Sequence, residues 1–373
     1  MTPSVRLLDD SDRIRAHIDA RAVAHNLSQL RQRLAGAATR IWATAKADAY
    51  GHGLSRVLPG LSEADGISVQ TLADAGACRR RGWCGPILVH AGLLGAGEVH
   101  ALTLPGIHLV ISHAEQLLWL ARTRPAAPPA LWLRYAGDTH LGGFDDADYS
   151  RAHAHAATLA ARGHVGAIGH LNHYARAEEE GGIAEAEARF MQAVRGLPGP
   201  VSSCNSAALL LHPSHAAATH WARPGITLYG VSPLPGVTGP DLGLVPAMTL
   251  AARLTAIVLL RAGTSLGYGG AYIAPQDTRV GLVACGYADG YPRHAGTGTP
   301  VRLADGRMSR LLGRPSMDTL AIDLAGMDDV RPGAEVTLWG EGLPVERVAA
   351  GASTIAAELL TCLTARVPFT PAT

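Results

Sequence analysis

Short apolar runs recur through the first two thirds of the chain, and helix-like stretches follow most of them. Eight of these runs are flanked by glycine, proline or polar residues: 41–45, 66–71, 86–90, 106–112, 131–136, 165–170, 200–205 and 224–230. Strands that alternate with helices predict a parallel sheet, and eight such units that close on themselves predict a TIM-type (β/α)8 barrel. We therefore expect an α/β fold with a barrel domain over residues 1–241.

The periodicity changes after residues 231–240, which hold three prolines and two glycines and are typical of a linker. Beyond them the strand candidates are 250–260, 279–285, 300–303, 308–312, 320–324 and 335–338. Asp305-Gly306 is a hairpin turn signal, and a final helix is expected over 354–364. The pattern predicts a second, mainly β domain over residues 242–373.

One further strand, 14–19, precedes the barrel, which leaves open that it packs with the C-terminal domain. Asp19 is expected to cap a helix whose Val23, Leu27, Leu30 and Leu34 share one face.

Composition narrows the class of protein. Apolar residues make up 47% of the chain, enough for a large core, and the net charge is only +1. Without a basic stripe interleaved with aromatics, a nucleic-acid partner is not expected. No run approaches the ~18 apolar residues of a membrane helix, and residues 1–15 lack the apolar segment of a signal peptide. Five scattered cysteines without Cys-x-x-Cys predict reduced thiols in the cytoplasm and no zinc site.

The stretch 43–53, ATAKADAYGHG, holds the strongest candidate for chemistry. Lys46 follows a predicted strand, at the end where α/β barrels place their active sites. A partly desolvated amine there is nucleophilic and can form a Schiff base with an aldehyde cofactor. A lone lysine is more often a solvated loop residue, so the whole string carries the prediction.

That string resembles the lysine motif of alanine racemases, in which a small or apolar run precedes Lys-Ala-Asn/Asp-Ala-Tyr-Gly-His-Gly. The resemblance extends to Asn205-Ser206-Ala207-Ala208 and to Arg223-Pro224-Gly225-Ile226-x-x-Tyr229-Gly230. It implies a fold-type III enzyme with pyridoxal 5'-phosphate (PLP) on Lys46. The cofactor-binding residues that it implies are Lys46, Tyr50, His170, Asn205, Ser206, Arg223, Gly225 and Ile226.

Physical chemistry supports two of these assignments. The segments around Ser206 and Gly225 fall after the seventh predicted strand and around the eighth, where barrels commonly bind phosphate. A hydroxyl and consecutive backbone N–H groups suit a phosphate dianion. The resemblance sets Arg223 against the pyridine nitrogen. Since arginine stays protonated, that nitrogen accepts a hydrogen bond, which limits carbanion build-up and favours racemisation over transamination.

Racemisation needs proton exchange on both faces of the substrate α-carbon. The resemblance assigns one face to Lys46 and the other to Tyr268, whose phenol has an ordinary pKa near ~10. It gives His170 the position that contacts Arg223 and hydrogen-bonds the phenol, favouring ionisation. His170 and His173 also form His-x-x-His. A metal pair is the alternative, but no third ligand is evident, and a strand would place the two on opposite faces.

Two further motifs, GYADGYPR at 286–293 and GRPSMD at 313–318, also match the family. They imply that Tyr287 lines the substrate entrance and that the Met317 backbone N–H meets the substrate carboxylate. Because the family draws these residues and Tyr268 from the partner subunit, the resemblance implies a head-to-tail homodimer with shared sites.

The sequence departs from the family at the substrate end. The family's often carbamylated lysine is Arg134, the arginine that touches the substrate carboxylate is Leu141, and the tyrosine at the entrance is Ala357. We expect Arg134 to fill part of the lost role, and a wider, more apolar pocket that accepts larger amino acids. The predicted function is interconversion of L- and D-alanine by a two-base mechanism. The alternatives are another fold-type III enzyme (a decarboxylase or a D-amino-acid dehydratase/aldolase) and a non-catalytic PLP-binding protein.

Overall fold

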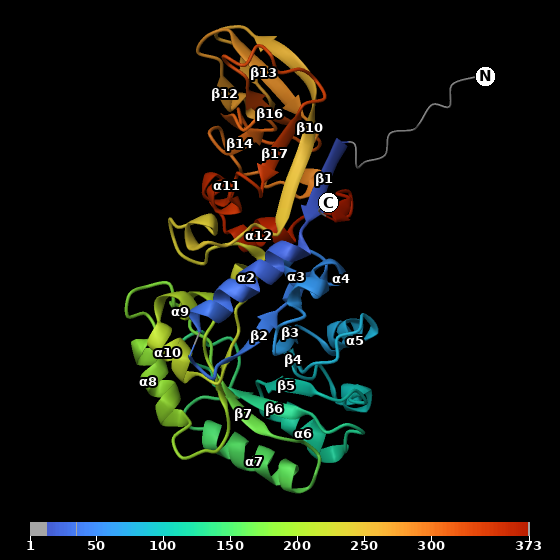
Figure 1. Cartoon of the computed structure of the whole chain (residues 1–373), viewed down its shortest axis with the longest axis vertical. Coiled ribbons are helices and arrows are strands. Elements are labelled where there is room, and N and C mark those ends of the chain that lie inside the picture. Colours follow the sequence, from blue (N-terminus) through green and yellow to red (C-terminus); the bar gives the residue numbers. More distant parts are fainter. Residues whose placement is uncertain (1–12, 35, 372–373) are drawn as a thin grey trace, which may run out of the picture.

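The computed structural model describes residues 13–34 and 36–371. The expectation for residues 1–15 therefore falls almost entirely outside the described residues. The chain folds into an eight-stranded parallel barrel followed by a mainly β region, which lie one above the other in Figure 1. The predicted fold class is thereby confirmed.

The barrel strands are joined side by side in the order β8-β7-β6-β5-β4-β3-β2-β9. Their bounds are β2 (Arg40–Thr44), β3 (Gly66–Val69), β4 (Ile87–Val89), β5 (Ile107–Ile111), β6 (Ala130–Arg134), β7 (Ile168–Leu171), β8 (Val201–Ser202) and β9 (Trp221–Ala222). Every pair in this order is parallel. The backbone N–H of His220 donates to the Val201 carbonyl over 3.0 Å, which brings the two end strands together and nearly closes the barrel.

One prediction was wrong at the last strand. The run 224–230 is not a strand: Ile226–Tyr229 form a 3-10 helix, η3, and the eighth strand is β9, just upstream. Gly225 has a φ of −122° and a ψ of −86°, which is incompatible with an extended chain. The apolar run therefore belongs to the turn that leaves the barrel.

Helices follow most of the barrel strands and cover the outside. They are α2 (Ala20–Arg33), α3 (Lys46–Tyr50), α4 (Leu54–Val57), η1 (Leu58–Leu61), α5 (Leu72–Arg80), η2 (Ala96–Ala101), α6 (Ala114–Arg122), α7 (Tyr149–Ala161), α8 (Ala184–Ala193), α9 (Ser206–Leu211) and α10 (Pro213–Ala218). The Asp19 side chain accepts from the backbone N–H of Arg21, and Val23, Leu27, Leu30 and Leu34 are all buried. The predicted cap and apolar face of α2 are confirmed.

The barrel interior is filled by a few large side chains. Trp42, Leu88, Val110, Trp132, Leu171 and Trp221 form a separate apolar cluster, and the rings of Trp42 and Trp221 stack with centroids 4.1 Å apart. Since successive residues of a strand point to opposite faces, each of these residues fixes which of its neighbours face inward. Glycines make room for the indoles: a Cβ on Gly66 would lie 2.2 Å from the Trp42 ring.

The C-terminal sheet has the core order β15-β14-β17-β10-β1-β18, and β13 joins β10 to β16. Its strands after the barrel are β10 (Met248–Leu260), β13 (Thr278–Val283), β14 (Pro300–Leu303), β15 (Met308–Arg310), β16 (Leu320–Asp323), β17 (Glu335–Trp339) and β18 (Phe369–Pro371). Between β10 and β13, β11 (Ser265–Leu266) and β12 (Tyr272–Ile273) pair with each other in a separate two-stranded sheet. The strand before the barrel, β1 (Ile14–Ile18), pairs antiparallel with β10 and parallel with β18. The first and last strands of the described residues therefore lie side by side in the same sheet.

Short elements complete this part of the chain. They are η4 (Pro240–Leu242), η5 (Tyr268–Gly270), η6 (Tyr287–Asp289), α11 (Val345–Gly351) and α12 (Ala356–Thr361). The turn at Asp305-Gly306 joins β14 to β15 in an antiparallel hairpin, as predicted. The final helix, α12, is shorter than expected. No helix among the described residues is long and apolar enough to cross a membrane.

Candidate active site

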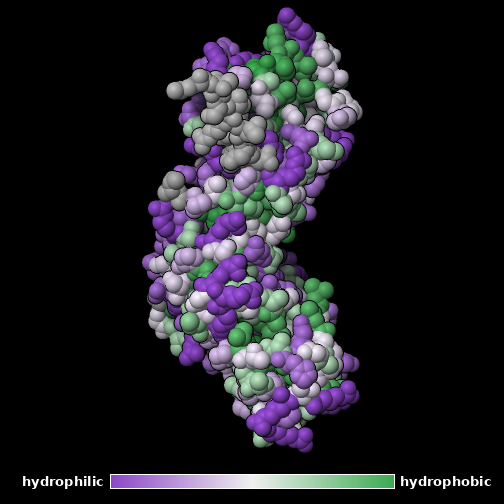
Figure 2. All heavy atoms as spheres, turned by 90° about the vertical axis from the view of Figure 1, so that its right-hand side faces the viewer, coloured by the Kyte–Doolittle hydropathy of each residue, from purple (hydrophilic) through white to green (hydrophobic). Residues whose placement is uncertain are grey.

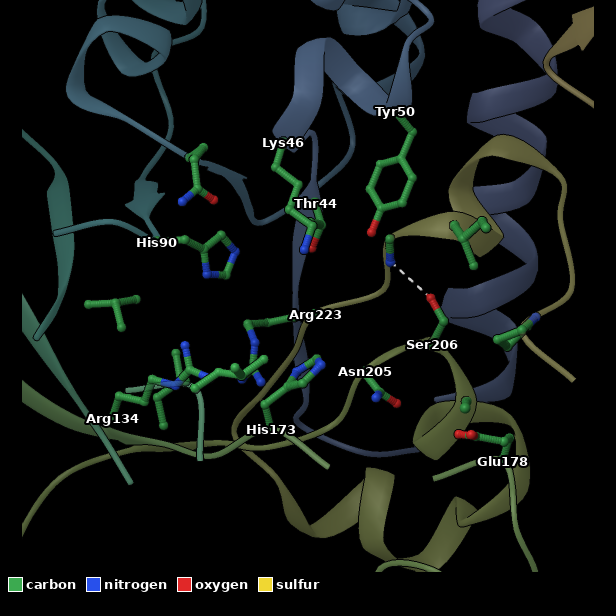
Figure 3. Close-up of a pocket in the computed structure, with 18 residues that line it drawn as sticks. Thr44, Lys46, Tyr50, His90, Arg134, His173, Glu178, Asn205, Ser206 and Arg223 are labelled. Carbon is green, nitrogen blue, oxygen red and sulfur yellow. Dashed lines mark hydrogen bonds between the residues drawn. The ribbon is translucent and has the colours of Figure 1, made fainter. Parts of the chain in front are cut away.

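A cavity of about 460 Å³ opens at the carboxyl ends of the barrel strands. Its lining residues are Thr44, Lys46, Tyr50, Gln70, His90, Val110, Arg134, Leu141, Leu171, His173, Glu178, Asn205, Ser206, Ala207, Arg223, Gly225, Ile226 and Pro233. Strand parity explains many of them: Thr44 lies two residues after the inward Trp42, Arg134 two after Trp132, and Arg223 two after Trp221. Figure 3 shows the side chains of Lys46, His90 and Arg223 converging on this space.

Lys46 begins α3 directly after β2, at an unusual backbone turn. Four consecutive non-glycine residues, Ala47 to Tyr50, have φ between 50° and 59°. A left-handed conformation costs roughly 1–2 kcal/mol per residue, so neighbouring contacts must hold it. The Asp48 side chain accepts from the backbone N–H of Leu54 over 2.8 Å, and the backbone N–H of Ala49 donates to the Ala45 carbonyl over 3.0 Å. The segment that follows Lys46 is therefore strained, and these hydrogen bonds hold it in place.

The electrostatic setting favours a neutral amine. Desolvation lowers the pKa of Lys46, and the positive charges of Arg223 and Arg134 lower it further. A lowered pKa increases the fraction of free amine at neutral pH, the form that attacks an aldehyde.

The opposite end of the cavity forms an anion cradle. The backbone N–H of Gly225 donates to the Ser206 hydroxyl over 2.9 Å, and that hydroxyl also lies 3.1 Å from Thr227 Oγ1. Asn205 caps α9 through its side chain, which accepts from the backbone N–H of Ala208 over 2.9 Å. A Cβ on Gly225 would lie 2.3 Å from the Tyr50 phenol oxygen, so only glycine leaves this corner open.

Arg223 is a buried cation at the floor of the cavity. Its guanidinium donates to Ser202 Oγ over 2.6 Å and to the Asn172 carbonyl. Burial lowers the pKa of Arg223 to about 10, so the group remains charged at neutral pH. No carboxylate among the described residues forms an ion pair with it. A buried cation held only by neutral acceptors is suited to an incoming polar ligand.

The prediction for His170 was wrong. His170 lies on β7 between two inward positions and therefore points outward, where its Nδ1 lies 3.0 Å from the Tyr149 phenol and its ring stacks on His153. His173 lines the cavity instead. Desolvation, followed by the charges of Arg223, Lys46 and Arg134, lowers the pKa of His173 to about 3, so this imidazole is neutral.

His90 is a cavity residue that sequence reasoning missed. It follows β4 with the same parity as the inward Leu88, and its Nε2 lies 3.2 Å from Ser68 Oγ. The Ser68 hydroxyl in turn donates to Thr44 Oγ1 over 3.0 Å, so a hydrogen-bonded chain links the ends of three neighbouring strands. Parity relative to the inward Leu88 and Leu171 was the available signal for His90 and His173.

The three residues at which this chain departs from the family's pattern all line cavities near Lys46. Arg134, at the end of β6, and Leu141, in the following loop, both line the cavity, and the Leu141 side chain is 77% exposed. Ala357 lies on the wall of a neighbouring cavity that also touches Lys46 and Tyr50.

Three predicted residues do not reach this cavity within their own chain. Tyr268, Tyr287 and Met317 are 76%, 37% and 53% exposed on the C-terminal region. Two backbone hydrogen bonds, from Tyr287 N–H to the Ser316 carbonyl and from Ala288 N–H to the Met317 carbonyl, join the loops that carry Tyr287 and Met317. Figure 1 shows β12, next to Tyr268, far from the α3 that holds Lys46.

The described residues hold no group of three or more histidine, cysteine or carboxylate side chains that could bind a metal ion. His170 points outward from β7, whereas His173, two residues past the end of the strand, lines the cavity.

Comparison with known proteins agrees with this geometry. A family model described as alanine racemase, N-terminal domain, matches residues 18–233, and one described as alanine racemase, C-terminal domain, matches residues 247–370. The chain is 44% identical to the alanine racemase of Bordetella avium over 364 residues, covering 95% of this chain and 97% of that one. It is 43% identical to the alanine racemase of Cupriavidus metallidurans over 366 residues, covering 96% and 97%.

Solved structures give the same result. The biosynthetic alanine racemase from Pseudomonas aeruginosa superposes with a TM-score of 0.89 at 37% identity, covering 97% of this chain and 99% of that one. The alanine racemase from Acinetobacter baumannii superposes with a TM-score of 0.88 at 30% identity, covering 96% and 99%.

Proposed function

This chain belongs to the alanine racemase family of PLP-dependent isomerases, and on that premise we propose how its residues racemise alanine. Lys46 carries the cofactor, Tyr268 of the partner subunit is the second base, and the active form is a homodimer. One observation carries the proposal: Lys46, Arg223 and the Gly225–Ser206 cradle line a single cavity.

The residues present fit PLP. Ser206 and the Gly225 turn form a cradle that a Cβ would fill, which suits the phosphate dianion. Lys46 supplies an amine for the aldehyde, and Arg223 a permanent donor for the ring nitrogen. When bound, the cofactor withdraws electrons through its ring and thereby acidifies the α-hydrogen of the amino acid.

Each base has a distinct task. The neutral Nζ of Lys46 removes the α-proton from one face or returns it, since its lowered pKa keeps part of the amine unprotonated. The Tyr268 phenol of the partner subunit exchanges a proton on the other face. We assign to His173 the role first given to His170: its neutral imidazole lies in the cavity with Arg223 and accepts a hydrogen bond from the phenol.

The separation of the two bases supports the proposed homodimer. Tyr268 is 76% exposed and Ile273, on the same hairpin, is 61% exposed. Figure 2 shows hydrophobic surface over part of the C-terminal region, on the face that lies to the right in Figure 1 and away from β12. An exposed apolar hairpin that carries a catalytic phenol is suited to insertion over a partner's barrel. We also propose a cytoplasmic location, since all five cysteines are free thiols.

The test is chiral chromatography of L-alanine and, separately, D-alanine incubated with the purified protein and PLP. Both reactions should approach an equal mixture of enantiomers, and Lys46→Ala should abolish the conversion. If neither enantiomer is converted while PLP is bound, the proposed function is wrong. Formation of ethylamine and carbon dioxide from alanine instead would point to a decarboxylase, and release of ammonia from D-serine in a parallel incubation would point to a dehydratase.

A further inference from the structure

A second cavity, of about 630 Å³, adjoins the active-site cavity on the side of the cradle. It lies between the segment after the barrel, around Pro233 and Leu234, and the helices α11 and α12. Glu178, Ile226 and Pro233 line both cavities. The two spaces therefore lie side by side and share these residues as a common wall, and we call the second space the annex.

The annex also reaches the lysine. Ala357 lines it, and Ala357 lines a third space together with Lys46 and Tyr50. Only a methyl group stands at this position, so no side chain separates the lysine from the annex there. A group bound at Lys46 can extend into the annex past Ala357.

The annex combines apolar walls with negative charge. Ile226, Leu234, Val237 and Ile355 supply apolar surface. Three carboxylates, Glu178, Asp241 and Glu346, face one guanidinium, Arg347. An apolar channel with an anionic end is complementary to an alkyl chain that ends in a cation.

The three carboxylates are not equally available. Glu346 Oε1 accepts from the backbone N–H groups of Ser232 and Gly239, each over 2.8 Å, and Asp241 accepts from Thr238. Among the described residues, no hydrogen bond or ion pair engages Glu178. Its carboxylate stands where the annex meets the active-site cavity and is free to bind an incoming cation.

We propose that the annex binds the side chain of a basic amino acid, such as lysine or ornithine, as a further substrate of the same racemase site. Ala357 leaves the passage open, the apolar walls hold the methylene chain, and Glu178 pairs with the terminal ammonium. The proposal rests on the proposed function, because it assumes that the amino group of the substrate binds at the place where Lys46 holds the cofactor.

The experiment compares lysine with norleucine, which has the same chain length but no terminal charge, and with alanine. Initial rates of racemisation give kcat/KM, and the concentration that half-saturates the change in cofactor absorbance gives binding. We expect the parent to favour lysine over norleucine by up to about fivefold, the size of one partly exposed charge pair. Glu178→Gln should reduce this ratio to about one, whereas Glu180→Gln, a neighbouring exposed glutamate outside the cavities, should leave it unchanged.

Ala357→Tyr supplies an independent variant, because it closes the passage without touching the charge. It should lower the ratio of kcat/KM for lysine to that for alanine by about tenfold or more. Equal use of lysine and norleucine by the parent, or an unchanged preference in Glu178→Gln, would overturn the proposal. If the parent does not racemise alanine at all, the proposed function itself is wrong. The failure of this proposal and the failure of the proposed function are therefore distinguishable.

Discussion

The Tyr50 phenol occupies the space that a side chain on Gly225 would need: a Cβ there would lie 2.3 Å from its oxygen. Burial raises the pKa of Tyr50 to about 12, so the phenol stays protonated beside the cradle. One glycine thus fixes both the backbone that presents N–H to Ser206 and the position of the ring that closes the cavity.

Gly225→Ala should therefore weaken PLP binding at least about tenfold, an effect of ~1.4 kcal/mol, by displacing Tyr50 and the N–H donor. Fluorescence titration of the apoprotein measures the dissociation constant. Gly97→Ala is the control, since nothing lies within 4 Å of a Cβ at that position. Pyridoxal without phosphate should respond much less than PLP; an equal response would remove Gly225 from the phosphate site.

Borohydride treatment of the PLP-loaded protein should fix the cofactor on one lysine. Lys46 is the only lysine of the chain, and it lines the cavity with a lowered pKa, so the labelled peptide should contain Lys46. Peptide mass mapping makes the measurement. A label on any other amine would contradict the assignment.

A matched pair of variants tests whether His173, and not His170, supports the catalytic phenol. His173→Asn should reduce kcat about tenfold or more, because the cavity imidazole that supports the phenol is lost. His170→Asn should retain kcat at a temperature where it is folded, since His170 faces α7. The reverse ranking would restore the interpretation made from sequence.

His170 instead affects stability in acid. Desolvation, and then His153, lower its pKa to about 4, below the ~6.5 of the unfolded chain. The unfolded state therefore binds the proton first as the pH falls. This stability contribution is complete above pH ~6.5 and is lost between ~6.5 and ~4. Urea unfolding at pH 7 and pH 5 measures how much the free energy of unfolding falls between these two pH values. This fall should be about 2 kcal/mol smaller for His170→Asn than for the parent. An equal fall in both proteins would contradict the prediction.

Much of the architecture was predictable because buried parallel strands are continuous apolar runs, as in 107–111 and 131–133. The eighth strand was misplaced because Ile226 and Leu228 are as apolar as strand residues, whereas the observed strand has only two residues, Trp221 and Ala222. Short runs carry too little periodicity to decide between a strand and a buried turn.

The site residues on or just after the barrel strands follow the two-residue alternation of inward positions, which the sequence analysis did not use. Counting in twos from Trp132 or Trp221 gives Arg134 and Arg223, and the same count from Leu171 gives His173 rather than His170. Loop residues such as Glu178 carried no such signal, because barrel closure and the packing of α11 and α12 decide where they lie. The second cavity could not be predicted from sequence for the same reason.

The central claim is that each active site combines Lys46 of one protomer with Tyr268 of its partner. Lys46→Ala should be inactive, and Tyr268→Phe should lose about a hundredfold or more in kcat while retaining the cofactor spectrum. After subunit exchange in an equal mixture, half of the dimers are mixed, and each mixed dimer contains one intact site. The mixture should recover roughly a quarter of the parent activity. No recovery, with exchange confirmed by native mass spectrometry, would contradict the shared site.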